Sequence, residues 1–95
     1  MARVGGGVSA PVLLRKREPQ YSDAARAAKI QGTVTLNVTI GPDGRAHDTV
    51  LARGVGFGLD EMAAEAVSDW TFAPGKRDGV PVSVQASIEV NFQLM

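Results

Sequence analysis

Residues 80–94 have the sequence VPVSVQASIEVNFQL, in which apolar and polar residues alternate over fifteen positions without a break in phase. This period of two is typical of a β-strand with one buried face and one face in water. A strand of this length would extend about 50 Å, whereas a compact domain of this size is about 30 Å across. We therefore expect the strand to bend, to contain a bulge, or to project beyond its own sheet.

The segment TVTLNVTI, residues 33–40, alternates in the same way and is rich in β-branched residues, which favours a strand. Gly41-Pro42-Asp43-Gly44 predicts a hairpin turn, because proline fixes one φ angle and Asp-Gly supplies a position with positive φ. The return strand would occupy about residues 45–53, with Val50 and Leu51 as its apolar centre.

Two helices are predicted. Ser22 has the side chain of an N-cap for a short helix over Asp23–Ile30, which Gly32 would end. From Leu59 the apolar residues recur at i, i+3, i+4, i+7, i+8 and i+11, as far as Trp70, which is the stripe of a helix that covers a sheet. The opposite face carries acidic residues, which we expect to be solvated.

Weaker signals complete the chain. Residues 1–10 are Gly-rich and small, so we expect a flexible lead-in followed by one domain over residues 11–95. Pro11 to Gln20 should be extended, with Val12–Leu14 as a possible short strand. Asp78-Gly79 is a second turn signal, which we expect to join residues 70–72 to the last strand.

Together these elements predict an α+β fold, in which a three-stranded, mainly antiparallel sheet packs against two helices. A right-handed crossover places the last strand beside strand 33–40. The predicted order is therefore return strand, first strand, last strand. The long C-terminal strand is then an edge, and an uncovered edge is a template for another chain.

Composition excludes several classes of function. The chain has 95 residues, ten basic and ten acidic side chains, one histidine and no cysteine. A neutral chain with few aromatic residues argues against a nucleic-acid partner. The lack of cysteine excludes a disulfide scaffold, a thiol nucleophile and a Cys-ligated zinc site. No stretch is apolar enough to span a membrane.

No residue pattern indicates catalysis, a metal site or a cofactor. The sequence GVGFG, residues 54–58, lies between a strand and a helix, but its glycines do not have the spacing of a dinucleotide loop, so a tight connection is the better interpretation. His47 near Asp43 and Asp48 is a poor metal set and is expected to face solvent. The serines lack a nucleophile-elbow context. We therefore expect a protein that is not an enzyme.

The basic run Arg15-Lys16-Arg17 is ambiguous. Its cations alternate sides of an extended segment, where they could meet acidic lipid, an acidic protein or water. A solvated loop is the favoured interpretation.

Several spaced motifs carry a family resemblance. They are, in order, Glu18-Pro19-Gln20-Tyr21-Ser22, Gln31-Gly32-Thr33-Val34, Gly41-Pro42-Asp43-Gly44-Arg45, Gly58-Leu59-Asp60, Trp70-Thr71-Phe72-Ala73-Pro74-Gly75 and Gly79-Val80-Pro81-Val82. They resemble the C-terminal domain of TonB-family energy transducers over about residues 11–94. The resemblance implies a periplasmic domain tethered to one inner-membrane helix outside this chain. Through that anchor it would work with a proton-driven motor complex.

The resemblance also implies a partner and its binding residues. Such domains grip the TonB box of outer-membrane receptors for siderophores, vitamin B12 or similar nutrients, by β-augmentation along the last strand. The residues implied there are Val82, Ser83, Val84, Gln85, Ala86, Ser87, Ile88, Glu89 and Val90. The family motif Q-P-x-Y-P, which contacts the receptor side, maps to Glu18, Pro19, Gln20, Tyr21 and Ser22. Glu replaces Gln and Ser replaces Pro in it.

Two alternatives use the same features. The long strand could pair with its own copy in a homodimer, or the chain could be a TonB-like subunit of a signalling or secretion system.

Overall fold

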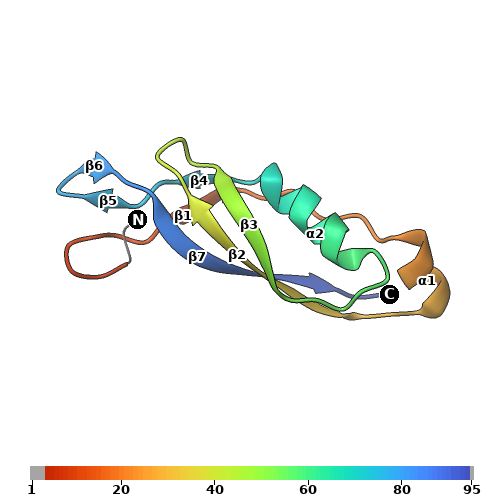
Figure 1. The fold of residues 1–95 in the computed structure, drawn as a ribbon. Helices are drawn as coiled ribbons and strands as arrows, with labels where there is room; N and C mark the ends of the chain where they lie inside the picture. Colours follow the sequence, from red (N-terminus) through yellow and green to blue (C-terminus); the bar gives the residue numbers. More distant parts are fainter. Residues whose placement is uncertain (1–3, 95) are drawn as a thin grey trace.

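The structure is a computed structural model that describes residues 4–94. The described residues form two helices and seven strands (Figure 1). In chain order these are β1 (Val12–Arg15), α1 (Asp23–Ala28), β2 (Gly32–Ile40), β3 (Ala46–Arg53), α2 (Leu59–Ser68), β4 (Thr71–Ala73), β5 (Lys76–Arg77), β6 (Val80–Pro81) and β7 (Val84–Phe92).

The main sheet has the order β3-β2-β7, and both of its pairings are antiparallel. The predicted α+β class, the strand order and the edge position of the last strand are therefore confirmed. The β2–β7 register is unbroken from Gly32 opposite Phe92 to Ile40 opposite Val84. By contrast, the β2–β3 register shifts twice.

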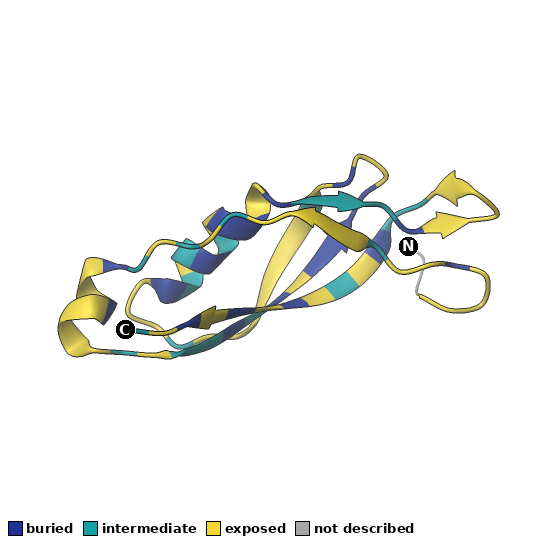
Figure 2. Cartoon of the chain, turned by 180° about the vertical axis from the view of Figure 1, so that it is seen from behind, coloured by how far each residue is buried: buried dark blue, intermediate teal, exposed yellow. Residues whose placement is uncertain are grey.

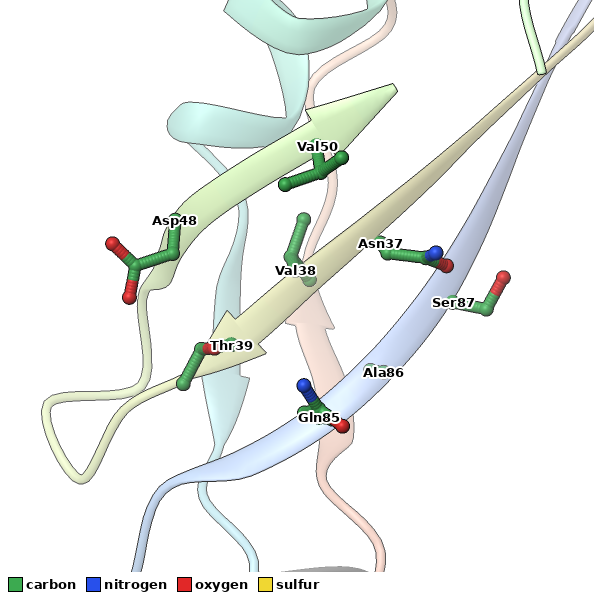
Figure 3. A pocket seen from close by; sticks show the side chains of 8 residues that line it. All are labelled: Asn37, Val38, Thr39, Asp48, Val50, Gln85, Ala86 and Ser87. Atoms are coloured by element: carbon green, nitrogen blue, oxygen red, sulfur yellow. The ribbon is translucent and has the colours of Figure 1, made fainter. Parts of the chain in front are cut away.

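One face of this sheet is covered and forms the core. Figure 3 shows α2, β1 and β4 behind the sheet. Alternation along β2 and β7 sends their apolar side chains toward the covered face, where they pack with α2 and Trp70. The core residues are Ala25, Val34, Leu36, Val38, Ile40, Leu59, Ala63, Val67, Trp70, Ile88, Val90 and Phe92. Buried positions accordingly alternate with exposed or half-buried ones along β7 in Figure 2, whereas the last three residues of β2 are all buried.

The long C-terminal alternation is interrupted, as expected, at Val82 and Ser83. There the Val82 amide donates to the Gly75 carbonyl at 2.9 Å, which turns the chain away from the line of β7. Val80 lies outside the core, with 61% of its surface exposed. The assumed width of about 30 Å was wrong, because the molecule measures 49 × 21 × 19 Å.

A small second sheet pairs β1 with β4, antiparallel. The short strand at Val12–Leu14 is confirmed, but the expectation that residues 70–72 join the last strand is wrong. The turn at Asp78-Gly79 instead joins β5 to β6 in a hairpin of its own. All four residues of β1 are exposed, so no burial pattern in the sequence could indicate the β1–β4 pairing.

The return strand differs from the prediction in its burial. Val50 and Leu51 are 60% and 49% exposed, so they are not an apolar centre. The register shifts twist β3, and Asp48 adopts a left-handed conformation with φ of 51°. An irregular edge strand of this kind cannot present a continuous apolar face to α2.

Both helices are shorter than predicted. The first ends at Ala28, because Lys29 takes a left-handed conformation with φ of 56°. The second ends at Ser68. Trp70 nevertheless stays 5% exposed in the core, where its amide donates to the Val67 carbonyl at 3.0 Å and its indole Nε1–H donates to the Arg17 carbonyl at 2.8 Å.

The segment before residue 11 contacts the domain. Val8 is buried and forms an isolated bridge with Arg77, while the Ser9 amide donates to the Lys76 carbonyl at 3.0 Å. The division into a flexible lead-in over residues 1–10 and a domain over residues 11–95 stays a prediction, and residues 1–3 and 95 lie outside the described residues.

Candidate partner-binding edge

The outer side of β7 is the candidate site. β7 is the last strand of its sheet, so within residues 4–94 it pairs along one side only, with β2. A strand of nine residues with one side unpaired offers a row of backbone donors and acceptors.

The hairpin decides which residues face outward. The Gly41 amide donates to the Arg45 carbonyl at 3.0 Å, so the backbone groups of Gly41 point toward β3. Because these groups alternate along an extended strand, odd-numbered residues of β2 face β3 and even-numbered ones face β7. Val84 stands opposite Ile40, so the even residues of β7 face β2. The residues facing the free side are therefore Gln85, Ser87, Glu89 and Asn91.

The same four residues carry the polar side chains that β7 presents on the uncovered face. Gln85, Ser87, Glu89 and Asn91 are exposed, whereas Val84, Ile88 and Val90 are buried and Ala86 is half-buried. In Figure 3 the side chains of Asn37, Gln85 and Ser87 lie over the sheet on its open face. Around them is a shallow hollow of about 500 Å³, lined by Asn37, Val38, Thr39, Asp48, Val50, Gln85, Ala86 and Ser87.

The motif before α1, residues 18–22, contains both buried and exposed side chains. Tyr21 is half-buried, and its hydroxyl donates to the Ile30 carbonyl. Pro19 is half-buried, while Glu18 and Gln20 are exposed. Glu18 lies 3.4 Å from the Lys16 ammonium. Glu18 and Gln20 are thus exposed to solvent, and Pro19 and Tyr21 are partly exposed.

Ser22 has a structural role in this motif. Its Oγ accepts the Ala25 amide at 3.1 Å, which confirms the predicted N-cap, and the hydroxyl donates to the Phe57 carbonyl. Ser22, one of the two residues that depart from the family motif, therefore ties the start of α1 to the turn before α2.

Two residues of the basic run, Lys16 and Arg17, contact other parts of the molecule. Arg17 forms ion pairs with Asp69 and Glu65, and its carbonyl accepts the Trp70 Nε1–H at 2.8 Å. The Lys16 ammonium lies 5.7 Å from the centre of the Trp70 ring. The favoured solvated loop was therefore wrong for Arg17, which fastens the extended segment to α2. These contacts join residues 48 to 54 positions apart in the sequence, and no local signal could have indicated them.

The glycine-rich loop is occupied by a side chain of its own helix. Asp60 Oδ1 accepts the Val55 amide at 2.9 Å, and both of its carboxylate oxygens lie near the Gly56 amide. The loop is thus the tight connection that was expected. Asp60 is half-buried, so it departs from the solvated acidic face predicted for this helix.

His47 lies at the sheet edge with its Nε2 2.9 Å from Asp43 Oδ2, and both side chains are about half exposed. The Arg45 amide, which donates to the Asp43 carboxylate, and then His47 lower the pKa of Asp43. Residues 4–94 hold no group of three carboxylate or imidazole side chains that could ligate a metal. Nor does any helix within them have the length and apolar character needed to cross a membrane.

The structure thus brings together part of the implied receptor contacts. Residues 84–90 lie on β7, whereas Val82 and Ser83 precede it and are half-buried. Asn91 lies within the alternation that continues through Phe92, and it is exposed like Gln85, Ser87 and Glu89.

Comparisons place this architecture in a family. The model of the Gram-negative bacterial TonB protein C-terminal family matches residues 17–94. The chain belongs to the TonB C-terminal family. Proteins of this family are energy transducers and not enzymes, in agreement with the expectation from the sequence.

Individual TonB proteins support the assignment. Protein TonB of Vibrio cholerae is 33% identical over 97 residues, which cover 94% of this chain and 40% of that protein. Protein TonB of Escherichia coli is 30% identical over 78 residues, covering 80% of this chain and 33% of that protein. The chain thus spans well under half the length of these relatives. The solution structure of the Pseudomonas aeruginosa TonB C-terminal domain superposes with a TM-score of 0.73 at 28% identity, covering 99% of this chain and 94% of that one.

Proposed function

We propose that this chain is the partner-gripping domain of a TonB-type energy transducer, and that the free side of β7 pairs with the TonB box of an outer-membrane receptor. The observation that carries the proposal is the row of outward backbone groups at Gln85, Ser87, Glu89 and Asn91, which face no other strand among the described residues. An extended segment added there would make a fourth strand of the main sheet.

Backbone pairing suits a protein that serves several receptors. The donors and acceptors of the ladder are the same for every amino acid except proline, so different segments can share one edge. Side chains at Gln85 and Ser87 would adjust which segment fits. Receptors for siderophores or cobalamin-type nutrients are the proposed partners, in the periplasm, with the domain tethered to the inner membrane and linked to a motor complex through that tether.

The motif before α1 would supply a second contact. Glu18 and Gln20 are exposed, and we assign them to the surface that meets the body of the receptor. Tyr21 would act indirectly, since its packing against Phe92 fixes where these neighbours lie. The Glu and Ser departures from the family motif would then alter partner preference through Glu18, because Ser22 is buried.

The test is an NMR titration of the labelled chain with a synthetic peptide that copies the TonB box of a receptor from the same organism. We expect chemical-shift changes along residues 84–92. Ser87→Pro removes an amide that faces the partner and spares the β2 ladder, so the affinity should fall roughly tenfold or more. Ser87→Ala is the matched control and should bind nearly as the parent does. Shifts confined to other parts of the chain would remove the edge model.

A homodimer is the second candidate, because the same unpaired edge could accept a second copy of β7. Sedimentation velocity from micromolar to millimolar concentration distinguishes the two proposals. A chain that stays monomeric leaves the edge available to a receptor, whereas a tight dimer that Ser87→Pro dissociates would favour self-pairing.

A further inference from the structure

Glu89 is the one charged residue in β7, and its neighbours on the open face are amides and hydroxyls. The carboxylate is exposed and makes no ion pair with any residue in 4–94. Thr35 stands opposite it on β2, and Arg53 stands opposite Thr35 on β3. Arg53 is therefore two strands away, which is about 10 Å between backbones.

The outward geometry of Glu89 brings a partner close to this charge. Its backbone groups face the free side, so an added strand would place one residue directly opposite it, with the two Cβ atoms about 5 Å apart. Both side chains would lie on the same face of the extended sheet. Opposite charges in such a cross-strand pair stabilise the pairing, and like charges weaken it.

We propose that Glu89 is a specificity-determining residue, which favours a partner strand carrying lysine or arginine opposite it and disfavours one carrying aspartate or glutamate there. The inference rests on the strand pairing proposed above and deepens it by naming the partner's chemistry. Gln85, Ser87 and Asn91 are neutral and both donate and accept hydrogen bonds, so they discriminate little by charge. Glu89 is thus the position on β7 at which the charge of a bound segment changes its affinity.

Charge at this position also selects the register. A bound strand can slide by two residues and keep the same side chains on the open face. Backbone pairing alone distinguishes such registers poorly, because the ladder is the same in each. A basic residue held opposite Glu89 favours one of them.

The experiment uses the TonB-box peptide of the titration above, resynthesised with Lys, Gln or Glu at the position that cross-strand NOEs place opposite residue 89. Each peptide is titrated into the parent chain, Glu89→Gln and Glu89→Lys. Glu61→Gln is the matched control, because Glu61 is exposed on α2 and has no ion-pair partner among the described residues.

For the parent chain we expect Kd to rise in the order Lys, Gln, Glu, by roughly two- to fivefold at each step. The differences should vanish for Glu89→Gln, reverse for Glu89→Lys, and remain unchanged for Glu61→Gln. They should also shrink as salt is added, because the pair is exposed to solvent.

Two other results would overturn the proposal in different ways. If all peptides shift the β7 resonances but rank the same against every variant, charge selection by Glu89 is wrong and strand pairing survives. If no peptide shifts the β7 resonances, the strand pairing is wrong and the role of Glu89 falls with it.

Discussion

The ring of Tyr21 meets the ring of Phe92 edge to face, with centroids 5.6 Å apart and planes at 89°. The contact joins the motif before α1 to the last residue of β7. The Tyr21 hydroxyl also donates to the Ile30 carbonyl, two residues before β2 begins. The tyrosine of the motif therefore fastens the extended segment to the end of the sheet.

Replacing Tyr21 should lower stability in two steps. Tyr21→Phe keeps the ring contact and loses one hydrogen bond, which costs about 1 kcal/mol. Tyr21→Ala also loses the ring, and should cost about 2 kcal/mol more. Urea unfolding followed by Trp70 fluorescence measures both. The exposed Gln20→Ala is the control, expected within about 0.5 kcal/mol of the parent. Equal stability of Tyr21→Ala and Gln20→Ala would contradict this role.

Two glycines with similar backbones should respond differently to alanine. Gly44 and Gly79 have φ of 76° and 81°, so an alanine is strained at either, by about 1 kcal/mol. At Gly44 the added Cβ would also lie 2.3 Å from the Phe72 carbonyl oxygen, whereas at Gly79 it would meet nothing within 4 Å. Thermal unfolding should show Gly44→Ala as the more destabilised variant by several kcal/mol. Similar melting temperatures would show that the hairpin turn is not held against β4 in solution.

The hydroxyl of Ser22 should contribute more to the free energy of unfolding than a hydroxyl on the surface does. Ser22→Ala removes the N-cap of α1 and the bond to Phe57, and should cost about 1–2 kcal/mol. Ser68→Ala, at the exposed end of α2, makes the same chemical change and should cost less than about 0.5 kcal/mol. Chemical unfolding of the two variants gives the comparison, and equal losses would argue against the tie between α1 and the turn before α2.

Acid should weaken the β2–β3 turn through Asp43. The Arg45 amide, and then His47, hold the pKa of Asp43 below its ordinary value in the folded chain. A lowered folded pKa stabilises the fold above the unfolded pKa of about 4, and this contribution is lost as the pH falls through the folded value.

Asp43→Asn should therefore be less stable than the parent near neutral pH, and the difference should shrink below pH of about 4. Urea unfolding across that range measures it. A difference that stays constant with pH would mean that the charge of Asp43 contributes nothing.

The sequence predicted the parts of the fold that local chemistry determines. Strict alternation in residues 33–40 and 80–94 marked β2 and β7, although β7 itself covers only Val84–Phe92, and Pro42 with Gly44 marked the turn. A turn of this type forces neighbouring strands to pair, and crossover handedness then placed β7 at the edge. The backbone edge of the candidate site followed directly from this order.

Contacts between distant segments could not be predicted in the same way. The ion pair between Arg17 and Asp69 joins two side chains that belong to no periodic pattern in the sequence. The pairing of β1 with β4 likewise has no periodic signal. Val50 and Leu51 look like core residues in the sequence, but the twist of β3 leaves them exposed. The irregular register of β3 determines the exposure of these two residues, and their apolar character alone does not indicate it.

The unbroken register between β2 and β7 has a mechanical consequence. Both strands run along the 49 Å axis, as Figure 1 shows, with nine residues of each in pairing. Tension applied along that axis to opposite ends of the two strands loads the ladder in shear, so its hydrogen bonds share the load and do not unzip one after another. A fourth strand held along β7 and pulled in the same direction would be retained by the same arrangement.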